Sequence, residues 1–421
     1  MKHHGDGSLP LLPLVRGEGA WLYDAGGNRY LDGISSWWVN LFGHCNPRIN
    51  AAIRDQLGRL EHAMLAGFTH EPVVELSERL SALTGSALGH CFYASDGASA
   101  TEIALKMSAH YWRNAGRPEK NGFLCLAGGY HGETVGALGV TDIPLFRDAY
   151  APLLRPATVL PSPDARNAAT PLAAARSAAA ALERHLAEHH AATAALIVEP
   201  LVQCAAGMAM HDPEYLRLAR GLCDHYEVHL ICDEIAVGFG RTGSFFAFEQ
   251  AGIRPDFLCL SKGITGGYLP LSVVMTHEAV YQAFYDDSTT RGFLHSHSYT
   301  GNPLACRAAL ATLDIFGQDD VLAANAGRAA AIDALLAPLA GHPAVRDYRR
   351  RGMIFALDVA ADAGFARRCR LAALQRELLL RPIGGPAGAT VYLMPPYILD
   401  DGETEHLCRA TAEALTEALT A

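Results

Sequence analysis

The sequence has 421 residues, of which half are hydrophobic and 19% are charged, and its formal net charge is −10. This composition predicts a globular protein with a large core and excludes a low-complexity chain. The negative charge argues against a nucleic-acid-binding domain, so we interpret the arginine-rich stretches 349–351 and 367–370 as solvated faces. No apolar run reaches the roughly 18 residues that a membrane span needs.

The first ten residues, MKHHGDGSLP, lack the apolar segment of a signal peptide. The ten cysteines form no CxxC pair, and Cys125, Cys232 and Cys259 lie inside apolar runs. Cysteines in such positions are typical of small core residues in a reducing compartment. We therefore expect a cytoplasmic protein that has no contact with a membrane.

The chain begins with predicted strands at 21–24 and 29–32, which flank the hairpin signal Gly26-Gly27-Asn28. The stretch Ser35-Ser-Trp-Trp38 follows. We do not expect two adjacent tryptophans to point the same way, so one can be core while the other lines a pocket for a bulky apolar ligand. The alternative is that both pack in the core.

The spacing of apolar residues predicts helices over residues 47–60 and 72–83, and a short strand over residues 91–94. This strand runs into Ser95-Asp-Gly-Ala-Ser99 and then into a helix with apolar or aromatic residues at every fourth position from 103. A helix N-terminus after such a turn can bind an anion, because unpaired N–H groups and the helix dipole converge there. The alternative is a capped helix with Ser95 or Asp96 as the N-cap.

Another predicted strand, 123–126, ends in the turn Gly128-Gly-Tyr-His-Gly132, where the aromatic pair can stack on a ligand or pack in an ordinary turn. Residues 142–170 are irregular, and residues 171–190 form a predicted helix with proline at its first position. The match of His185–His189 to the HxxEH pattern of zinc proteases lacks a supporting context, so we interpret it as a solvated face and predict no metal site.

Short apolar runs then alternate with helices and loops; the runs lie at 195–198, 228–232, 257–260 and 273–275. Such alternation predicts a mostly parallel sheet covered by helices. Ligands bind beyond the carboxyl ends of parallel strands. Glu199, Asp233 and Lys262 each follow one of these runs, and we expect them to lie close together.

Lys262 stands between an apolar run and glycines at 263, 266 and 267. By itself this pattern favours a surface lysine, but burial would depress the pKa of the lysine and let it form a Schiff base. Asp233 could hold a protonated ring nitrogen, Tyr130 could stack on the ring, and the turn at 95–99 could bind a phosphate. These are the parts that a pyridoxal phosphate site needs, whereas no P-loop or GxGxxG pattern points to a nucleotide.

The texture changes to helix, hairpin and helix from residue 316 onward, and the strand 391–397 is stopped by two prolines. We predict a large cofactor-binding domain over residues 46–315. A smaller α+β domain is predicted from the two ends of the chain, residues 1–45 and 316–421.

Several motifs occur together in a family-specific order: Glu199-Pro, Asp233-Glu-Ile-Ala-Val-Gly-Phe-Gly-Arg-Thr-Gly243, the lysine segment and Gly301-Asn-Pro303. In these motifs the chain resembles the class III aminotransferases of the fold-type I pyridoxal phosphate family, and the resemblance covers essentially its whole length. It implies an α/β fold with a mostly parallel central sheet, pyridoxal 5'-phosphate as the cofactor, and a homodimer with active sites at its interface.

Within this class, three features resemble the branch that serves biotin biosynthesis: Ser35-Ser-Trp-Trp38, Asp233-Glu-Ile-Ala236 and Tyr392-Leu-Met-Pro-Pro-Tyr397. The resemblance implies ping-pong transfer of an amino group from S-adenosylmethionine to 8-amino-7-oxononanoate. The alternatives are lysine as the amino donor, another class III ω-amino acid–pyruvate transaminase, and a catalytically silent binding protein with the same fold.

The resemblance also assigns roles to individual residues. Lys262 would bind the cofactor covalently, Asp233 would meet its ring nitrogen, and Tyr130 would stack on its ring. Further cofactor contacts are implied for Asp96, Gly97, Ala98, His131, Glu199 and, from the neighbouring subunit, Ser298. Further substrate contacts, beside Tyr130 and Lys262, are implied for Trp37, Trp38, Arg241, Ser296, Arg381 and Tyr392, with Arg381 gripping a carboxylate.

The chain departs from the family pattern in three places. Ala98 stands where the phosphate turn usually has serine, and Ser298 stands where threonine is usual. The segment Trp-His-Pro-x-Thr-Gln, with which the family normally begins, does not precede Met1. We expect either a start codon that was assigned too late or a different way of closing the pocket.

Overall fold

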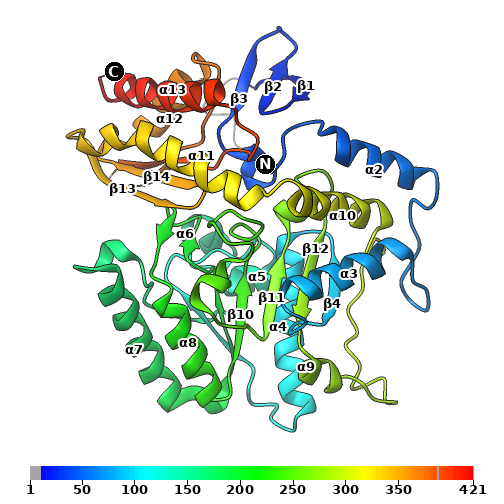
Figure 1. Ribbon diagram of the computed structural model, residues 1–421. Helices are drawn as coiled ribbons and strands as arrows, with labels where there is room; N and C mark the ends of the chain where they lie inside the picture. Colours follow the sequence, from blue (N-terminus) through cyan, green and yellow to red (C-terminus); the bar gives the residue numbers. More distant parts are fainter. Residues whose placement is uncertain (1–10, 386–387, 421) are drawn as a thin grey trace. The chain divides into compact units, whose positions relative to one another are not determined.

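The structure is a computed structural model that describes residues 11–385 and 388–420, and it contains two compact units. One unit combines the residues up to Asn50 with those from Asp319 onward, and the other spans Ala51–Gln318. Figure 1 traces the order of the elements within each unit. Within the described ranges, no helix combines the length and the apolar character that crossing a membrane requires.

The unit Ala51–Gln318 is built on a seven-stranded sheet (Figure 1). Its strands, in spatial order, are β4 (His90–Ala94), β12 (Ser272–Thr276), β11 (Phe257–Leu260), β10 (His229–Asp233), β7 (Thr193–Val198), β5 (Gly122–Leu126) and β6 (Thr158–Leu160). All neighbours from β11 to β6 pair in parallel, which confirms the predicted mostly parallel sheet.

Two strands of this sheet differ from the expectation or extend it. β12 runs antiparallel to both β11 and β4. The segment expected to be irregular supplies the edge strand β6, whose three residues are too short to show a periodic pattern.

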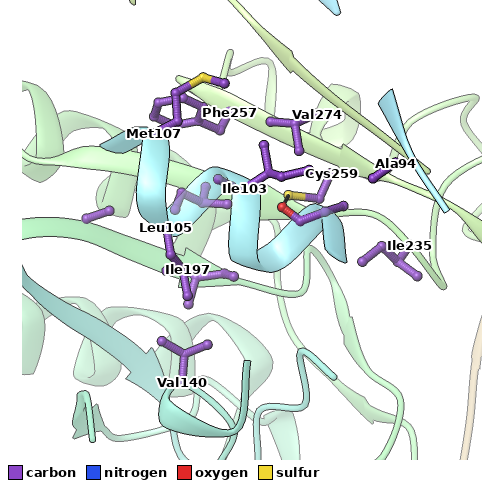
Figure 2. Close-up of a cluster of buried hydrophobic side chains, with 14 of the residues drawn as sticks. Ala94, Ile103, Leu105, Met107, Val140, Ile197, Ile235, Phe257, Cys259 and Val274 are labelled. Carbon is purple, nitrogen blue, oxygen red and sulfur yellow. Dashed lines mark hydrogen bonds between the residues drawn. The ribbon is translucent and has the colours of Figure 1, made fainter. Parts of the chain in front are cut away.

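Helices surround this sheet: α3 (Glu71–Leu83), α4 (Gly97–Asn114), α5 (Val135–Gly139), α6 (Pro144–Arg147), α7 (Pro171–His189), α8 (Glu214–His225), α9 (Glu278–Gln282) and α10 (Pro303–Gln318). Figure 2 shows Ile103 and Met107 of α4 among Phe257, Cys259 and Val274 of the central strands. Residues four apart on a helix share one face, so the apolar spacing read from the sequence is the face that buries α4 on the sheet.

The other unit contains two four-stranded sheets. The first consists of β1 (Leu14–Glu18), β2 (Trp21–Asp24), β3 (Arg29–Asp32) and β15 (Leu378–Leu379), and the second of β13 (Val345–Arg351), β14 (Ile354–Val359), β17 (Gly388–Leu393) and β16 (Ile383–Gly385). The helical segments are α1 (Ser35–Trp38), α2 (Pro47–Leu57), which continues into the other unit, α11 (Val321–Leu336), α12 (Phe365–Leu374) and α13 (Asp401–Thr420). The parallel pairing of β3 with β15 joins the two ends of the chain in one sheet.

The arginine-rich stretches carry their own acidic partners. Arg349 lies 2.6 Å from Asp347 and 2.9 Å from Asp358, and Arg368 lies 2.8 Å from Asp362. Local carboxylates thus offset the positive charge, but the Arg349 side chain is only 10% exposed, so the interpretation as a solvated face is wrong for Arg349.

The cysteines and histidines singled out in the sequence also have clear positions. Cys125, Cys232 and Cys259 are buried, which confirms them as core residues. The rings of His185 and His189 lie 4.7 Å apart on α7, and the described part of the chain contains no group of three or more His, Cys, Asp or Glu that could hold a metal ion.

Candidate active site

The three polar residues at the ends of apolar runs lie on neighbouring strands. Glu199 directly follows β7, Asp233 is the last residue of β10, and Lys262 begins the short 3₁₀ helix η5 (Lys262–Thr265) after β11. Since β7, β10 and β11 are consecutive and parallel, their carboxyl ends meet at one edge of the sheet. The sequence expectation that these side chains converge is confirmed.

The carboxylate of Asp233 is held by two hydrogen bonds. Its Oδ2 lies 2.7 Å from Nδ1 of His131, and its Oδ1 accepts the backbone N–H of Ile235 at 3.1 Å. Both Asp233 and His131 are buried. A buried carboxylate with fixed oxygens keeps one orientation, which is what a partner for a ring nitrogen requires.

The turn that carries Tyr130 and His131 is anchored independently of their rings. Thr101 Oγ1 donates to the carbonyl oxygen of His131 at 2.8 Å, and the backbone N–H of His131 donates to Thr141 Oγ1 at 3.0 Å. The backbone N–H of Tyr130 donates to Glu199 Oε2 at 3.1 Å. Hydrogen bonds therefore tie this turn to the end of β7 as well as to the end of β10.

Glu199 accepts backbone hydrogen bonds and has a raised pKa. Its second oxygen, Oε1, accepts the backbone N–H of Cys204 at 3.0 Å. Burial raises the pKa of Glu199 to about 7, and the nearby charge of Asp233 acts in the same direction. The carboxylate thus links two loops at the edge of the sheet.

Lys262 lies within the electrostatic influence of these acids. Burial lowers the pKa of its ammonium, and the attraction of Asp233, Cys204 and Glu199 opposes that shift. The side chain retains part of its exposed surface. An amine that is both reachable and more easily deprotonated can attack a carbonyl carbon.

The turn before α4 lies against the same loops. Asp96 is the N-cap, because its side chain accepts the N–H of Ser99 at 3.0 Å. A Cβ on Gly97 would lie 3.0 Å from Ile235, and a Cβ on Gly132 would lie 2.6 Å from Cβ of Ala98. The start of α4 is therefore close to Ile235, two residues after Asp233, and to Gly132 in the Tyr130 turn, and such a helix start suits a phosphate.

The other predicted site residues of this unit differ in how far they are buried. Tyr130 is partly buried, its hydroxyl donates to Glu133 at 2.9 Å, and burial raises the pKa of its phenol, so the hydroxyl stays protonated at neutral pH. Arg241 is buried in the loop after β10. Ser296 and Ser298 are exposed in the loop that leads to α10.

The predicted substrate residues of the other unit form their own cluster. Trp38 is 6% exposed and its indole N–H donates to the hydroxyl of Tyr392 at 3.2 Å. Trp37 is 54% exposed, and Cζ of the exposed Arg381 lies 3.7 Å from the centroid of its ring. One tryptophan is core and the other faces outward, which is the first of the two arrangements that the sequence left open.

No role was assigned from the sequence to two carboxylates that are buried in the structure, Glu234 and Asp32. Glu234 is buried next to Asp233 and accepts the backbone N–H groups of Ala247 and Phe248, both at 2.7 Å, while burial raises its pKa to about 8. Asp32 is fully buried at the end of β3. The available signal was an acidic residue at or next to the end of a short strand, the pattern that also marks Glu199 and Asp233.

Comparisons with known proteins identify the family of the chain. A family model described as aminotransferase class III matches residues 3–415. The adenosylmethionine-8-amino-7-oxononanoate aminotransferase of Helicobacter pylori is 45% identical over 421 aligned residues, which cover 97% of this chain and 93% of that protein.

Solved structures are similar over nearly the whole chain. The adenosylmethionine-8-amino-7-oxononanoate aminotransferase of Methanocaldococcus jannaschii matches with a TM-score of 0.91 at 33% identity, covering 97% of this chain and 94% of that one. A PLP-bound amine transaminase from an uncultivated Pseudomonas species matches with a TM-score of 0.93 at 31% identity, covering 99% and 97%. The fold is therefore that of a transaminase. More specifically, the chain belongs to the class III aminotransferase family.

Proposed function

We propose that this chain uses pyridoxal 5'-phosphate to move the amino group of S-adenosylmethionine onto 8-amino-7-oxononanoate, which yields 7,8-diaminononanoate for biotin biosynthesis. The chemistry rests chiefly on one observation, the convergence of Lys262 and the His131-bound Asp233 on neighbouring strand ends. The choice of substrates is supported by the Helicobacter pylori relative, whose name states that reaction.

The residues present fit the cofactor. A helix start suits its phosphate, a buried carboxylate suits its protonated ring nitrogen, and a lysine with a lowered pKa suits its aldehyde. When bound, pyridoxal phosphate supplies an electron-accepting ring that stabilises negative charge on the substrate carbon. Gly97 and Ala98 would hold the phosphate through backbone N–H groups, and Tyr130 would cover one face of the ring.

The protein's own groups would orient the reactants and move the proton. Asp233, with His131 on one oxygen and Ile235 on the other, would keep a ring nitrogen protonated. Lys262 would act as general base and acid, moving a proton from the substrate carbon to the C4′ carbon of the cofactor, a role that its lowered pKa favours. Glu199 would keep the Tyr130 turn in place.

Arg381 would bind the carboxylate of the substrate. Its Cζ lies 3.7 Å from the centroid of the Trp37 ring, and its guanidinium N–H groups would bind a carboxylate as a planar, bidentate partner. Trp37 would add an apolar surface for the aliphatic chain or the adenosyl group. Trp38 and Tyr392 would support this region within the same unit. Arg241 and Ser296 are proposed as further substrate contacts.

The working unit would be a homodimer, in which Ser298 of one subunit reaches the phosphate site of the other. An exposed apolar surface supports this: Met64, Phe68, Leu294 and Tyr299 are each more than half exposed. The two segments that carry these residues, 62–68 and 294–299, lie side by side, because the ring centroids of His62 and Tyr299 are 5.0 Å apart. Size-exclusion chromatography with light scattering would give twice the chain mass, and a monomer that is fully active would overturn the dimer.

The two units would divide the work. The unit Ala51–Gln318 corresponds to the cofactor-binding domain expected at 46–315, and the unit from both chain ends to the smaller domain. We place the protein in the cytoplasm, because the buried cysteines suit a reducing compartment.

The test is an assay of the purified protein with pyridoxal phosphate, S-adenosylmethionine and 8-amino-7-oxononanoate, with product identified by mass spectrometry. Formation of 7,8-diaminononanoate is expected, together with complementation of a biotin auxotroph that lacks this step. Lys262→Ala should abolish turnover and the visible absorbance of the covalently bound cofactor. Activity with lysine instead of S-adenosylmethionine would change the donor, and activity confined to β-alanine and pyruvate would refute the substrate assignment.

A further inference from the structure

The segment Ser35–Trp38 has an unusual backbone. Its four successive residues have φ angles of 51°, 47°, 72° and 74°, and none of them is glycine. In this left-handed region the Cβ of an L-residue crowds the backbone, which is why single glycines normally occupy it. A run of four such residues persists only where the surroundings hold it, and strained backbone of this kind gathers at functional sites.

Asp32 holds the turn from one side. Its Oδ1 accepts the backbone N–H of Ser36 at 2.8 Å, and its Oδ2 accepts the hydroxyl of Ser36 at 2.7 Å. His44 Nε2 lies 3.1 Å from the same Oδ2 and orients the carboxylate. Because Asp32 is fully buried, no water competes for these hydrogen bonds.

A second attachment holds the turn to the other sheet of the same unit. Ser35 Oγ donates to the carbonyl oxygen of Met394 at 2.7 Å, directly after β17. Trp38 donates to Tyr392 on that strand. Hydrogen bonds thus hold the strained turn to the ends of both β3 and β17, and the directions of its side chains depend on both attachments.

The consequence falls on Trp37. The held turn sends Trp38 into the core and leaves Trp37 exposed under the guanidinium of Arg381. If the turn relaxed to a right-handed conformation, the indole of Trp37 would leave this stacking position. The pair would then lose the arrangement of an apolar face next to a carboxylate-binding edge.

We propose that Asp32 is a positioning residue for substrate binding: through Ser36 it holds the left-handed turn that places Trp37 beneath Arg381, and it thereby sets the affinity for substrates that carry a carboxylate. This inference rests on the proposed function, because Arg381 and Trp37 act as substrate contacts only there. Asp32 itself touches no reacting group.

The structural half of the test needs no substrate. The chain has four tryptophans, Trp21, Trp37, Trp38 and Trp112. Labelling with 5-fluorotryptophan therefore provides four ¹⁹F resonances, which single Trp→Phe variants assign. In the holoenzyme, Asp32→Ala should shift or broaden the resonances of Trp37 and Trp38 and leave that of Trp112 unchanged. Unchanged Trp37 and Trp38 resonances in Asp32→Ala would overturn the proposal.

Asp24→Ala is the matched control. Asp24 is also a buried aspartate of the first sheet, and it accepts the backbone N–H groups of Gly26 and Asn28, both at 2.9 Å. Its loss should disturb the hairpin and the Trp21 resonance while it leaves Trp37 in place. If Asp24→Ala moved Trp37 as far as Asp32→Ala does, the effect would be general destabilisation and the proposal would fail.

The kinetic half measures the split between KM and kcat. Asp32→Ala should raise KM for 8-amino-7-oxononanoate about tenfold or more and lower kcat at most about threefold, because a displaced binding contact weakens binding without altering the chemistry. Asp32→Asn keeps one acceptor oxygen for the Ser36 N–H and should recover part of the loss. Should Asp32→Ala not fold, Ser36→Ala, which removes one of the two hydrogen bonds, should still raise KM about threefold.

The two halves separate this inference from the proposed function. A wild-type protein that turns over while Asp32→Ala keeps both its spectrum and its KM would remove the role of Asp32 and leave the transaminase intact. If the wild-type protein shows no turnover but Asp32→Ala displaces the Trp37 and Trp38 resonances, the role of Asp32 in holding the turn stands and the transaminase activity is refuted.

Discussion

His131→Phe is the variant that best isolates the orientation of Asp233. The ring of His131 donates its one short hydrogen bond to Asp233 Oδ2 at 2.7 Å, whereas the backbone of the residue is held by Thr101 and Thr141. Phenylalanine keeps the ring volume and removes the donor. The turn should therefore stay in place while Asp233 loses one of its two hydrogen bonds.

The expected loss follows from the strength of that bond. A hydrogen bond to a charged group contributes about 1.5–3 kcal/mol. If that energy acts on the transition state, kcat/KM should fall about 10- to 150-fold, since each 1.4 kcal/mol is a factor of ten. The affinity for pyridoxal phosphate, measured by titration of its visible absorbance, should fall in the same direction.

Two further variants make the measurement decisive. His131→Asn places an amide N–H where Nδ1 stood and should retain most of the activity. His229→Phe changes another buried histidine, the first residue of β10, which bonds Ser108 at 2.8 Å and stacks on Trp112. It should lower stability yet keep kcat/KM within about threefold. The reasoning is refuted if His131→Phe keeps its kcat/KM within twofold, or if the Asn and Phe variants are equally impaired.

Three other changes probe stability and the phosphate turn. Lys120 is fully buried, and burial lowers its pKa to about 8, whereas an exposed lysine has a pKa of 10.5. The charge of Lys120 therefore destabilises the folded state below pH 8. This destabilisation fades as the pH rises from 8 to 10.5. Lys120→Met removes this charge together with the 2.7 Å hydrogen bond from Lys120 Nζ to the carbonyl oxygen of His190. Its free energy of unfolding in urea, relative to wild type, should therefore fall by about 1–3 kcal/mol as the pH rises from 7 to 10.5, and a pH-independent difference would contradict this. Gly132→Ala places a Cβ 2.6 Å from that of Ala98 at a φ of +119°. It should weaken pyridoxal phosphate binding about tenfold or more through overpacking, and an unchanged dissociation constant would exclude this contact as a determinant. Glu234→Gln leaves one of two buried N–H groups poorly matched and should cost about 1–3 kcal/mol of unfolding free energy, whereas Glu249→Gln, whose bond is 3.3 Å long, should cost less.

Much of the site could be predicted because its residues follow local patterns. Glu199, Asp233 and Lys262 each close a short apolar strand, and in a parallel sheet the ends of such strands meet. The divergence of Trp37 and Trp38 was also expected, because two adjacent large rings cannot both be buried in one direction. The roles of these residues in binding cofactor and substrate remain predictions.

Other features had no local signal. The bond between His131 and Asp233 joins residues 102 positions apart, and no periodicity reports such a pair. β12 reads as an apolar run like its neighbours, yet it runs in the opposite direction. Strand direction is set by the path of the connecting chain and not by the residues of the strand.

The sequence by itself determined which strands are buried and which polar residues close them, because burial and turn chemistry are written in neighbouring residues. Only the tertiary structure decided how those residues are held. Asp233 is oriented by a histidine from a distant turn, and the left-handed turn at Ser35–Trp38 is maintained by Asp32 and by Met394, which is 359 positions away from Ser35. Serine and tryptophan carry no local preference for that backbone, so the strain could arise only where the folded sheets impose it.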